Sequence, residues 1–438
     1  MRCYIDMIKP KNKHIKYVGI LMLSCSMLML GYFVPKHNFS QQIGFFAVGL
    51  AGLWMFRRGD FSNIFLIGLL LRLTLIASIP LLSDDYIRFL WDGYLTSEGI
   101  NPFNFKPSEL QFLAQENDFA NSLFVNLTSK NSYSTYTPVN QWIFYFSAST
   151  HSILGGIVSL RIILIGFEIA TYFVLKQILQ RYQINEKKLI FYWLNPLVIL
   201  ELTGNLNTEG IFLFFLITAL LSLSKIQDIK GGLLLSLSFC SNILSVIFLP
   251  LILLKGGKYR WHKLLLGFLT FSIFVFFPFL DLNNLYDYYQ NLIESFQNES
   301  FNASLFAIKD WFNFQILGFE GSQVYEQILF LCSVFIIVTI SWRFRYRNRK
   351  VLFTGLTLII STFFFLSPSV YPSYVIIPLA LSLFTHLTFP LIWSGLVFLS
   401  YSYYDNSIPT ILKSSLLFTE YIVVFVFLYR DLKLSFKK

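Results

Sequence analysis

Long apolar runs separated by short polar segments make up most of this chain. Each run approaches the ~20 residues that a helix needs to cross a bilayer. Clear runs cover 17–34, 41–56, 61–82, 157–179, 205–224, 264–280, 324–342, 351–366, 374–389, 390–404 and 411–429, and shorter or broken ones cover 138–153, 189–202 and 231–254. The pattern predicts an all-α polytopic membrane protein with about 11 to 14 transmembrane helices. Because no internal repeat or linker divides it, residues 1–438 are expected to form a single membrane domain.

Two polar loops, 83–137 and 281–323, interrupt these runs, and the first opens with a dense cluster of charge. On a helix, the polar members of this cluster share an arc of about 120°. They are Asp84, Asp85, Arg88, Trp91 and Asp92. Apolar side chains take the opposite side, so we expect a helix along the membrane surface with its carboxylates away from lipid. Charge at the mouth of a span is costly, and function is the usual reason for keeping it there.

Composition supports an integral membrane protein, because 55% of residues are hydrophobic, 13% are charged and the mean hydropathy is +0.59. A soluble domain carries about 25% charged residues. The apolar run from Tyr17 to Val34 has spanning length and no small-residue cleavage site, so we expect a retained anchor. The net charge of +10 lies in short clusters between apolar runs, as the positive-inside bias predicts, and does not indicate a nucleic-acid partner.

The basic clusters orient the chain in the membrane. They are Arg2 to Lys16, Arg57–Arg58, Lys255 to Lys263, Arg343 to Lys350 and Arg430 to Lys438. Placing all of them in the cytoplasm puts both long loops on the opposite, extracytoplasmic side. The cluster from Arg181 to Lys188 also favours the cytoplasm, yet two full spans between 138 and 179 would put it outside. Either 138–153 is only partly inserted, or this cluster breaks the rule.

No cofactor is firmly implied by the sequence. The cysteines are Cys3, Cys25, Cys240 and Cys332, none of which lies in a long polar loop, so a disulfide framework is not expected. The histidines are scattered singly, without metal-ligand spacing. A divalent metal stays an open alternative that no ligand motif supports.

Three further polar islands border apolar runs: Tyr133 to Trp142, Asn195 to Glu209, and Ser367 to Tyr374. The second carries two carboxylates and several amides, which are costly against lipid and are expected to face a cavity or to form a capped turn. The first reads as an interfacial aromatic belt and the third as a proline-broken hinge or a plain turn. Arg72 and Arg161 lie near span ends, where long side chains can reach the interface. Glu168 and Glu420 lie deeper, without a defined partner.

These motifs resemble those of bacterial polyprenol-phosphate-dependent mannosyltransferases of the glycosyltransferase-C superfamily. The resemblance rests on Asp84-Asp85-x-x-Arg88-x-x-Trp91-Asp92-Gly93 followed by Gly99-Ile100-Asn101-Pro102-Phe103, on Tyr136-Thr137-Pro138, on Asn195-Pro196 through Gly204-Asn205 and Glu209, on Phe301-Asn302-Ala303-Ser304-Leu305-Phe306, and on Ser367-Pro368 through Pro372 and Tyr374. It covers roughly residues 60 to 380. Thr137 replaces a proline of the pattern, Tyr371 stands where a histidine is common, and Ser241-Asn242 stand where relatives often carry a lysine.

The resemblance implies transfer of a hexose, with mannose as the leading expectation, from a polyprenyl-phosphate sugar to a glycan, glycolipid or other acceptor. It places the transfer at the outer face of the bacterial cytoplasmic membrane and implies inversion at the anomeric carbon. Such chemistry needs a base near the acceptor hydroxyl and cations near the departing phosphate. Asp85 or Asp84 is the expected base, and Arg88, Lys106 and Lys309 are the expected phosphate contacts. The expected acceptor or sugar contacts are Trp91, Asp92, Asn101, Tyr136, Asn205, Glu209, Asn302, Tyr371 and Tyr374.

Two other classes of function stay open at this point. A polymerase or ligase of lipid-linked polysaccharide shares the outer-leaflet lipid donor and large polar loops. A secondary transporter explains the span number, but it predicts internal repeats and carboxylates near the bilayer midplane. The acidic cluster directly after a span favours the glycosyltransferase.

Overall fold

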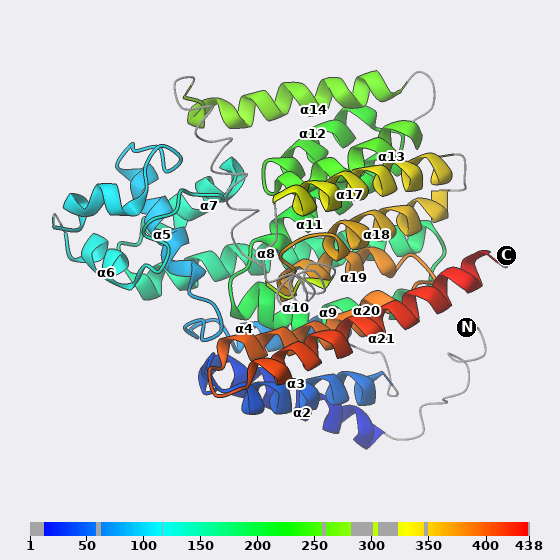
Figure 1. Cartoon of the computed structure of the whole chain (residues 1–438), viewed down its shortest axis with the longest axis horizontal. Helices are drawn as coiled ribbons and strands as arrows, with labels where there is room; N and C mark the ends of the chain where they lie inside the picture. Colours follow the sequence, from blue (N-terminus) through cyan, green and yellow to red (C-terminus); the bar gives the residue numbers. More distant parts are fainter. Residues whose placement is uncertain are drawn as a thin grey trace.

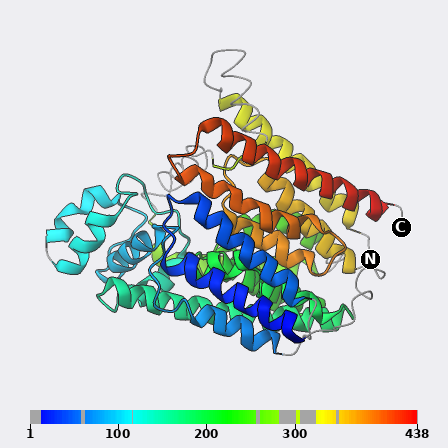
Figure 2. The same cartoon turned by 90° about the horizontal axis from the view of Figure 1, so that it is seen from below.

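The described part of the chain is helical. The computed structural model describes residues 13–57, 63–115, 117–255, 260–281, 301–304, 323–345 and 349–436. Within these ranges every regular element is a helix, apart from one isolated bridge between Phe301 and Ser369. The long helices lie side by side in a bundle, and the helices of the first loop form a lobe at one end (Figures 1 and 2). The all-α polytopic membrane architecture is confirmed.

Six described helices are long and apolar enough to cross a membrane. They lie in α2 (Lys13–Tyr32), α3 (Phe39–Phe56), α8 (Ile153–Arg181), α14 (Trp261–Phe276), α17 (Gln323–Phe344) and α21 (Thr410–Phe436). A seventh candidate is bent by 113° between the segment Pro196–Gly204 and α11 (Glu209–Ser224). The first part of this bent pair contains α10 (Pro196–Val198) and η3 (Ile199–Gly204), a π-helical turn.

Shorter helices fill the space between the long ones. They are α4 (Ile64–Leu73), η2 (Glu186–Leu189), α9 (Ile190–Trp193), α12 (Asp228–Phe239), η4 (Ile243–Phe248), α13 (Leu249–Lys255), η5 (Phe277–Phe279), α18 (Arg349–Phe365), η7 (Pro372–Val375), α19 (Ile376–Ser382), α20 (Phe389–Leu396) and η8 (Val397–Tyr404). Several of the expected full-length spans are therefore broken: the run 61–82, for example, is helical only from Ile64 to Leu73. The expected 11 to 14 spans are reached only if the shorter apolar helices also cross the membrane.

The first loop and the helix that follows it fold into a lobe with a hydrophobic cluster of its own. The lobe contains α5 (Asp85–Ser97), η1 (Pro107–Gln115), α6 (Asp118–Asn126) and α7 (Pro138–Ala148), and its cluster includes Leu90, Trp91 and Leu123. The expected helix after Ser83 is present as α5. Both of its faces are buried, however, because α6, α7 and α8 pack against it, so α5 is not an open amphipathic helix.

A glycine sets the distance between α5 and α7. A Cβ on Gly93 would lie only 2.1 Å from the carbonyl oxygen of Phe144 in α7, so no larger residue fits without displacing a backbone. The closeness lets Phe89 of α5 stack on Phe144 with ring centroids 4.6 Å apart. The glycine of the Trp91-Asp92-Gly93 motif therefore has a packing role.

The lengths of the two helices after residue 138 bear on the topology that the sequence left open. With 11 residues, α7 is about 16 Å long, roughly half of a bilayer core, whereas α8 has 29 residues. Of the two, only α8 is long enough to cross a membrane, which favours 138–153 as the partly inserted segment. At the far end of α8, Lys188 donates to the carbonyl of Thr385, close to where Arg430 of α21 donates to Thr388. The cluster Arg181 to Lys188 thus lies with the C-terminal basic cluster.

Two arginines expected to reach the interface are instead buried. Arg72 pairs with Glu168 at 2.7 Å, with both side chains almost completely buried, and its guanidinium lies over the Trp193 ring. Glu168 also accepts from Thr203. Arg161 donates to the carbonyls of Thr203 and Gly204 in η3 and to that of Ile76. The snorkelling expectation was wrong because broken helices expose carbonyls that need donors inside the bundle.

We expect the lobe to be extracytoplasmic, because both described chain ends, whose sequences belong to basic clusters, lie at the opposite end of the bundle (Figure 1). Single cysteines at the exposed positions Ser108 and Lys187, in a background without native cysteines, test this prediction. The cysteine at 108 should react with an impermeant maleimide on intact cells, and the one at 187 only after permeabilisation. The reverse labelling pattern would show that the lobe lies on the cytoplasmic side.

Candidate functional site

A cavity of about 640 Å³ lies where the lobe meets the bundle. Its walls come from the start of α5, the loop 128–137, the bend between η3 and α11, the α12–η4 connection, the segment 367–374 and η8. Lys36, in the connection between α2 and α3, completes the rim. Segments distant in the sequence thus share one polar, open chamber at the lobe end.

Four carboxylates among the described residues line this cavity: Asp84, Asp85, Glu201 and Glu209. Asp84 and Asp85 are exposed to it, and Asp85 accepts a hydrogen bond from the Ser83 hydroxyl at 3.0 Å. Glu209 begins α11 directly after the bend, and its Oε2 atom is buried without a hydrogen-bond partner. The chamber therefore presents carboxylates from three elements, α5, η3 and α11, toward the same space.

The cations among the described lining residues are Lys36, Arg88 and Lys106. Lys36 pairs with Asp84 at 2.6 Å. The ammonium of Lys106 lies 4.9 Å from the centre of the Tyr133 ring. The cavity thus carries groups of both charges, with one ion pair at its rim.

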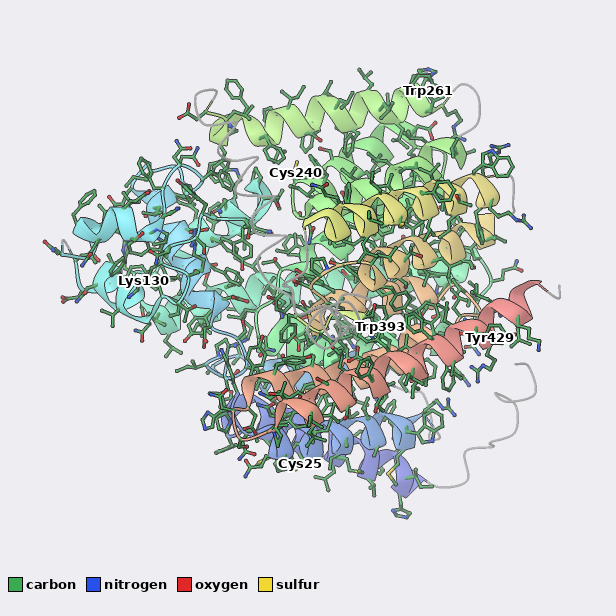
Figure 3. All side chains as sticks on the ribbon, in the orientation of Figure 1. Cys25, Lys130, Cys240, Trp261, Trp393 and Tyr429 are labelled. Atoms are coloured by element: carbon green, nitrogen blue, oxygen red, sulfur yellow. The ribbon has the colours of Figure 1, made fainter. Side chains whose placement is uncertain are left out.

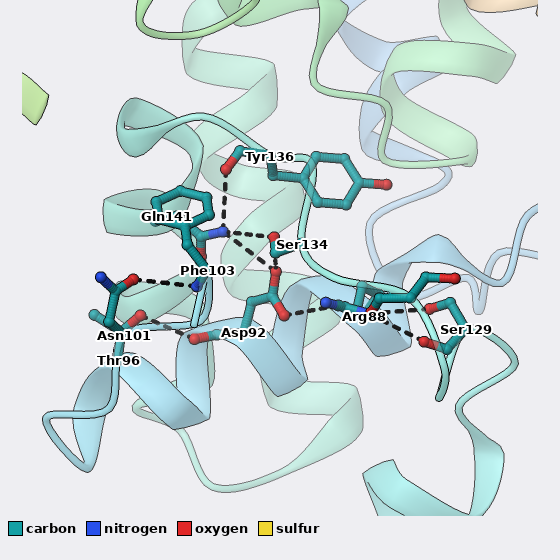
Figure 4. A network of polar contacts seen from close by, with 10 residues as sticks. Arg88, Asp92, Thr96, Asn101, Phe103, Ser129, Ser134, Tyr136 and Gln141 are labelled. Carbon is teal, nitrogen blue, oxygen red and sulfur yellow. Dashed lines mark hydrogen bonds and ion pairs between the residues drawn. The ribbon is translucent and has the colours of Figure 1, made fainter. Parts of the chain in front are cut away.

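Arg88 is held by a buried network (Figure 4). Its Nε atom donates to Asp92 Oδ1 at 2.7 Å, and its Nη1 atom donates to the carbonyls of Ser129 and Ser132. Asp92 also accepts from the Ser134 hydroxyl and from Gln141 Nε2. The pair ties α5 to the loop that forms the cavity wall, so Asp92 orients Arg88 and does not itself line the cavity.

Glu201 is a cavity carboxylate that the sequence analysis did not single out. Its side chain accepts from the Tyr401 hydroxyl at 2.7 Å, from Asn207 at 2.8 Å and from Asn205 at 3.3 Å. Asn205 is buried, binds both Glu201 and Tyr401, and does not line the cavity. These bonds join η3 to η8 and fix the bend.

Tyrosines form much of the cavity's aromatic wall, among them Tyr136, Tyr371, Tyr374, Tyr401 and Tyr404. Burial first, and then the nearby Asp85 carboxylate, raise the pKa of Tyr136 well above its usual range. Its hydroxyl therefore stays protonated. In Figure 4 the Tyr136 carbonyl accepts from Gln141 while the ring points away from Asp92.

The structure brings together most of the expected site residues. Those lining the cavity are Asp84, Asp85, Arg88, Lys106, Tyr136, Glu209, Tyr371 and Tyr374. Lys309 lies outside the described residues, as does most of the loop 281–323. Ser241 and Asn242, where the family pattern often has a lysine, line the cavity without charge.

The other expected contacts have packing or bridging positions. Trp91 is fully buried in the lobe, against Phe124. Asn101 donates to the carbonyl of Phe279 and so ties the lobe to the end of α14. Asn302 donates to Glu420, which also accepts from Trp393, a buried residue near the middle of the bundle (Figure 3). These residues support the site from outside the cavity.

Lys36 and Glu201 are the lining charges that sequence reasoning missed. Lys36 stands alone after the first span, outside any basic cluster, and an isolated lysine on the predicted outer side was the available signal. Glu201 lies in a polar island that was recognised, but which of its carboxylates faces the cavity depends on the 113° bend.

In the part of the chain that the structure describes, no group of three or more His, Cys, Asp or Glu side chains is arranged to hold a metal ion. The described cysteines, Cys25, Cys240 and Cys332, are free, and Figure 3 shows Cys25 and Cys240 far apart.

The fold and cavity define a polytopic α-helical membrane protein with a charged chamber at one membrane face. Residues 10–255, more than half of the chain, match the family described as "Alpha-(1->6)-mannopyranosyltransferase, N-terminal domain". The chain belongs to this family. It is also similar to alpha-(1->6)-mannopyranosyltransferase B of Corynebacterium glutamicum, with 32% identity over 158 residues. That match covers 35% of this chain and 26% of the relative, so the chain spans about a quarter of the relative's length.

The Arg88–Asp92 pair leads to a stability prediction. Asp92→Ala leaves a buried guanidinium without its carboxylate, a change that costs about 3–5 kcal/mol in comparable buried pairs. We expect a clear fall in the thermal unfolding midpoint of the purified protein. Glu98→Ala, at the exposed C-terminal end of α5, is the matched control and should change stability by less than about 0.5 kcal/mol. Equal midpoints for both variants would contradict the network's structural role.

Proposed function

We propose that this protein transfers a mannosyl residue from a polyprenyl-phosphate sugar to a glycan, glycolipid or other acceptor at the lobe-side face of the membrane. The observation that carries the proposal is the cavity, which combines carboxylates, cations and tyrosines at the boundary between lobe and bundle. Family membership supports mannose as the sugar. A lipid-linked donor supplies its headgroup from the membrane surface, which is where such a chamber can receive it.

The transfer requires one proton acceptor and one site for the departing phosphate. The acceptor hydroxyl oxygen attacks the anomeric carbon and forms the new glycosidic bond, while the bond from that carbon to the phosphate oxygen breaks. The hydroxyl proton passes to a carboxylate, and the phosphate leaves with the bonding electrons. Attack from the face opposite the phosphate inverts the anomeric carbon. This chemistry needs no redox partner.

Asp85 is the carboxylate we assign as the base. It starts α5 at the cavity rim, one helical turn before Arg88, so base and cation come from one rigid helix. Asp84 pairs with Lys36, and the Glu201 carboxylate accepts from Tyr401, Asn205 and Asn207. Glu201 is thus held by three hydrogen bonds, and Asp84 serves as the counter-ion of Lys36, so neither is the base that we assign. Glu209, with a buried unpartnered oxygen, is suited to accept hydrogen bonds from sugar hydroxyls.

The transporter alternative predicts carboxylates in the spans that are available to coupling ions. Two buried carboxylates in the described spans have partners instead: Glu168 pairs with Arg72 and accepts from Thr203, and Glu420 Oε1 accepts from Trp393 and Asn302. These contacts favour the enzyme. A polymerase or ligase of lipid-linked polysaccharide shares the donor chemistry, and the size of the product separates it from a single-sugar transferase.

The proposal is tested with purified protein, polyprenyl-phosphate mannose and a panel of acceptor glycans, with the product analysed by mass. Asp85→Asn should lower the turnover rate by at least ~10²-fold, because the base is lost while shape is kept. Asp118→Asn, an exposed acid of the same loop outside the cavity, is the matched control and should turn over normally. Unchanged turnover in Asp85→Asn, with a normal unfolding midpoint, would remove Asp85 from the role. Addition of a preassembled glycan block would instead support the polymerase.

A further inference from the structure

A lysine outside every sequence motif lies at the rim of the cavity. Lys36 follows α2 and precedes α3, and its ammonium pairs with Asp84 Oδ2 at 2.6 Å while lying 5.1 Å from the centre of the Tyr404 ring. It therefore joins the N-terminal helix pair to the lobe and to η8 at the cavity.

The connection that carries Lys36 is fixed in place by hydrogen bonds. The carbonyl of Pro35 accepts from the Asn38 N–H at 3.1 Å and from Gln42 Nε2 at 2.7 Å. The Phe39 N–H donates to Asp405 Oδ2 at 3.1 Å, which anchors the start of α3 to the segment after η8. The lysine backbone is thus preorganised, and an anion that binds its ammonium need not order a free loop.

The Lys36–Asp84 pair is open to exchange with a ligand. The side chains are 34% and 47% exposed, so the pair is partly hydrated and its stabilising contribution is small. An ammonium has three donors, which leaves capacity beyond Asp84. By contrast, Nε and Nη1 of Arg88 are bound to Asp92 and to loop carbonyls. Of these two cavity cations, Lys36 has the counter-ion that is easier to displace.

We propose that Lys36 receives the phosphate of the lipid donor, and that Asp84 is its resident counter-ion, displaced when the phosphate enters. The ammonium binds the phosphate before and after transfer, because the group is anionic in both states. Asp84 then has a gating role, which separates its function from that of Asp85. This inference rests on the proposed lipid-phosphate donor and adds a residue from the α2–α3 connection to its binding site.

Affinities for farnesyl phosphate, farnesol and inorganic phosphate, measured on the purified full-length protein, test the inference. Lys36→Ala should weaken farnesyl phosphate binding by about tenfold or more, because one charge-assisted contact is lost, and should leave farnesol binding unchanged. Lys36→Arg should retain most of the affinity. Lys130→Ala is the control, since this lysine lies in the lobe, outside the cavity (Figure 3), and should bind like the wild type. Inorganic phosphate binding as tight as that of farnesyl phosphate would identify a free-anion site instead of a lipid headgroup site.

The counter-ion is tested by Asp84→Asn alone and combined with Lys36→Ala. Asp84→Asn should bind farnesyl phosphate at least as tightly as the wild type, because no carboxylate competes for the ammonium. If Lys36 only neutralised Asp84, the double variant would regain wild-type affinity; direct phosphate contact predicts that it stays weak. Wild-type affinity in Lys36→Ala, or its recovery in the double variant, would overturn the inference.

The outcome also separates this inference from the proposed function. If the wild type does not prefer farnesyl phosphate over farnesol, the lipid-phosphate donor itself is wrong. If the wild type shows that preference and Lys36→Ala keeps it, the donor proposal stands and only the role of Lys36 fails.

Discussion

The guanidinium of Arg161 satisfies the backbone where the chain breaks, and the cavity depends on that break. A span that turns by 113° within the bundle exposes carbonyls that lipid cannot hydrate. Arg161, itself buried, donates to the carbonyls of Thr203 and Gly204 and to that of Ile76 where α4 has already ended. One side chain on α8 thereby stabilises two interrupted spans. The bend lies inside the second of them, between η3 and α11, and it brings Glu201 and Glu209 to the chamber.

A second set of buried charges, anchored on the same helix α8, supports the same bend. Glu168 lies two helical turns along α8 from Arg161 and binds both Arg72 and Thr203. Buried ion pairs of this kind add little net stability compared with apolar packing, but removing one partner leaves an uncompensated charge. Their value here is positional, since they connect α4, α8 and η3 through groups that have few alternative partners.

The lobe has a different structural role: it holds the charged helix α5 rigidly beside the cavity. Its own hydrophobic cluster buries Trp91 and neighbouring side chains, while the contact at Gly93 locks α5 against α7. The polar side chains of α5 have two roles, one structural and one in lining the cavity. Asp92 and part of Arg88 face the loop 128–137, whereas Asp84 and Asp85 open into the chamber. A single helix thus supplies both the structural pair and the candidate reactive groups.

The sequence by itself determined the membrane class and the helix after Ser83, because apolar run length and the cost of charge near lipid are local properties. Its family resemblance predicted site positions for Asp84, Asp85, Arg88, Glu209 and Tyr371, and these five side chains line the cavity. The sequence did not determine that Asp92 and Asn205 point away from the cavity, that α7 ends after 11 residues, or that Lys36 reaches the cavity. Those outcomes depend on contacts between residues far apart in the chain, such as Asn205 with Tyr401 and Lys36 with Asp84. Only the packing of distant helices decides which polar groups face the chamber and which are hydrogen-bonded to a neighbouring side chain. The physical reason is that hydrogen-bond partners in a bundle depend on proximity in space, not on proximity in sequence.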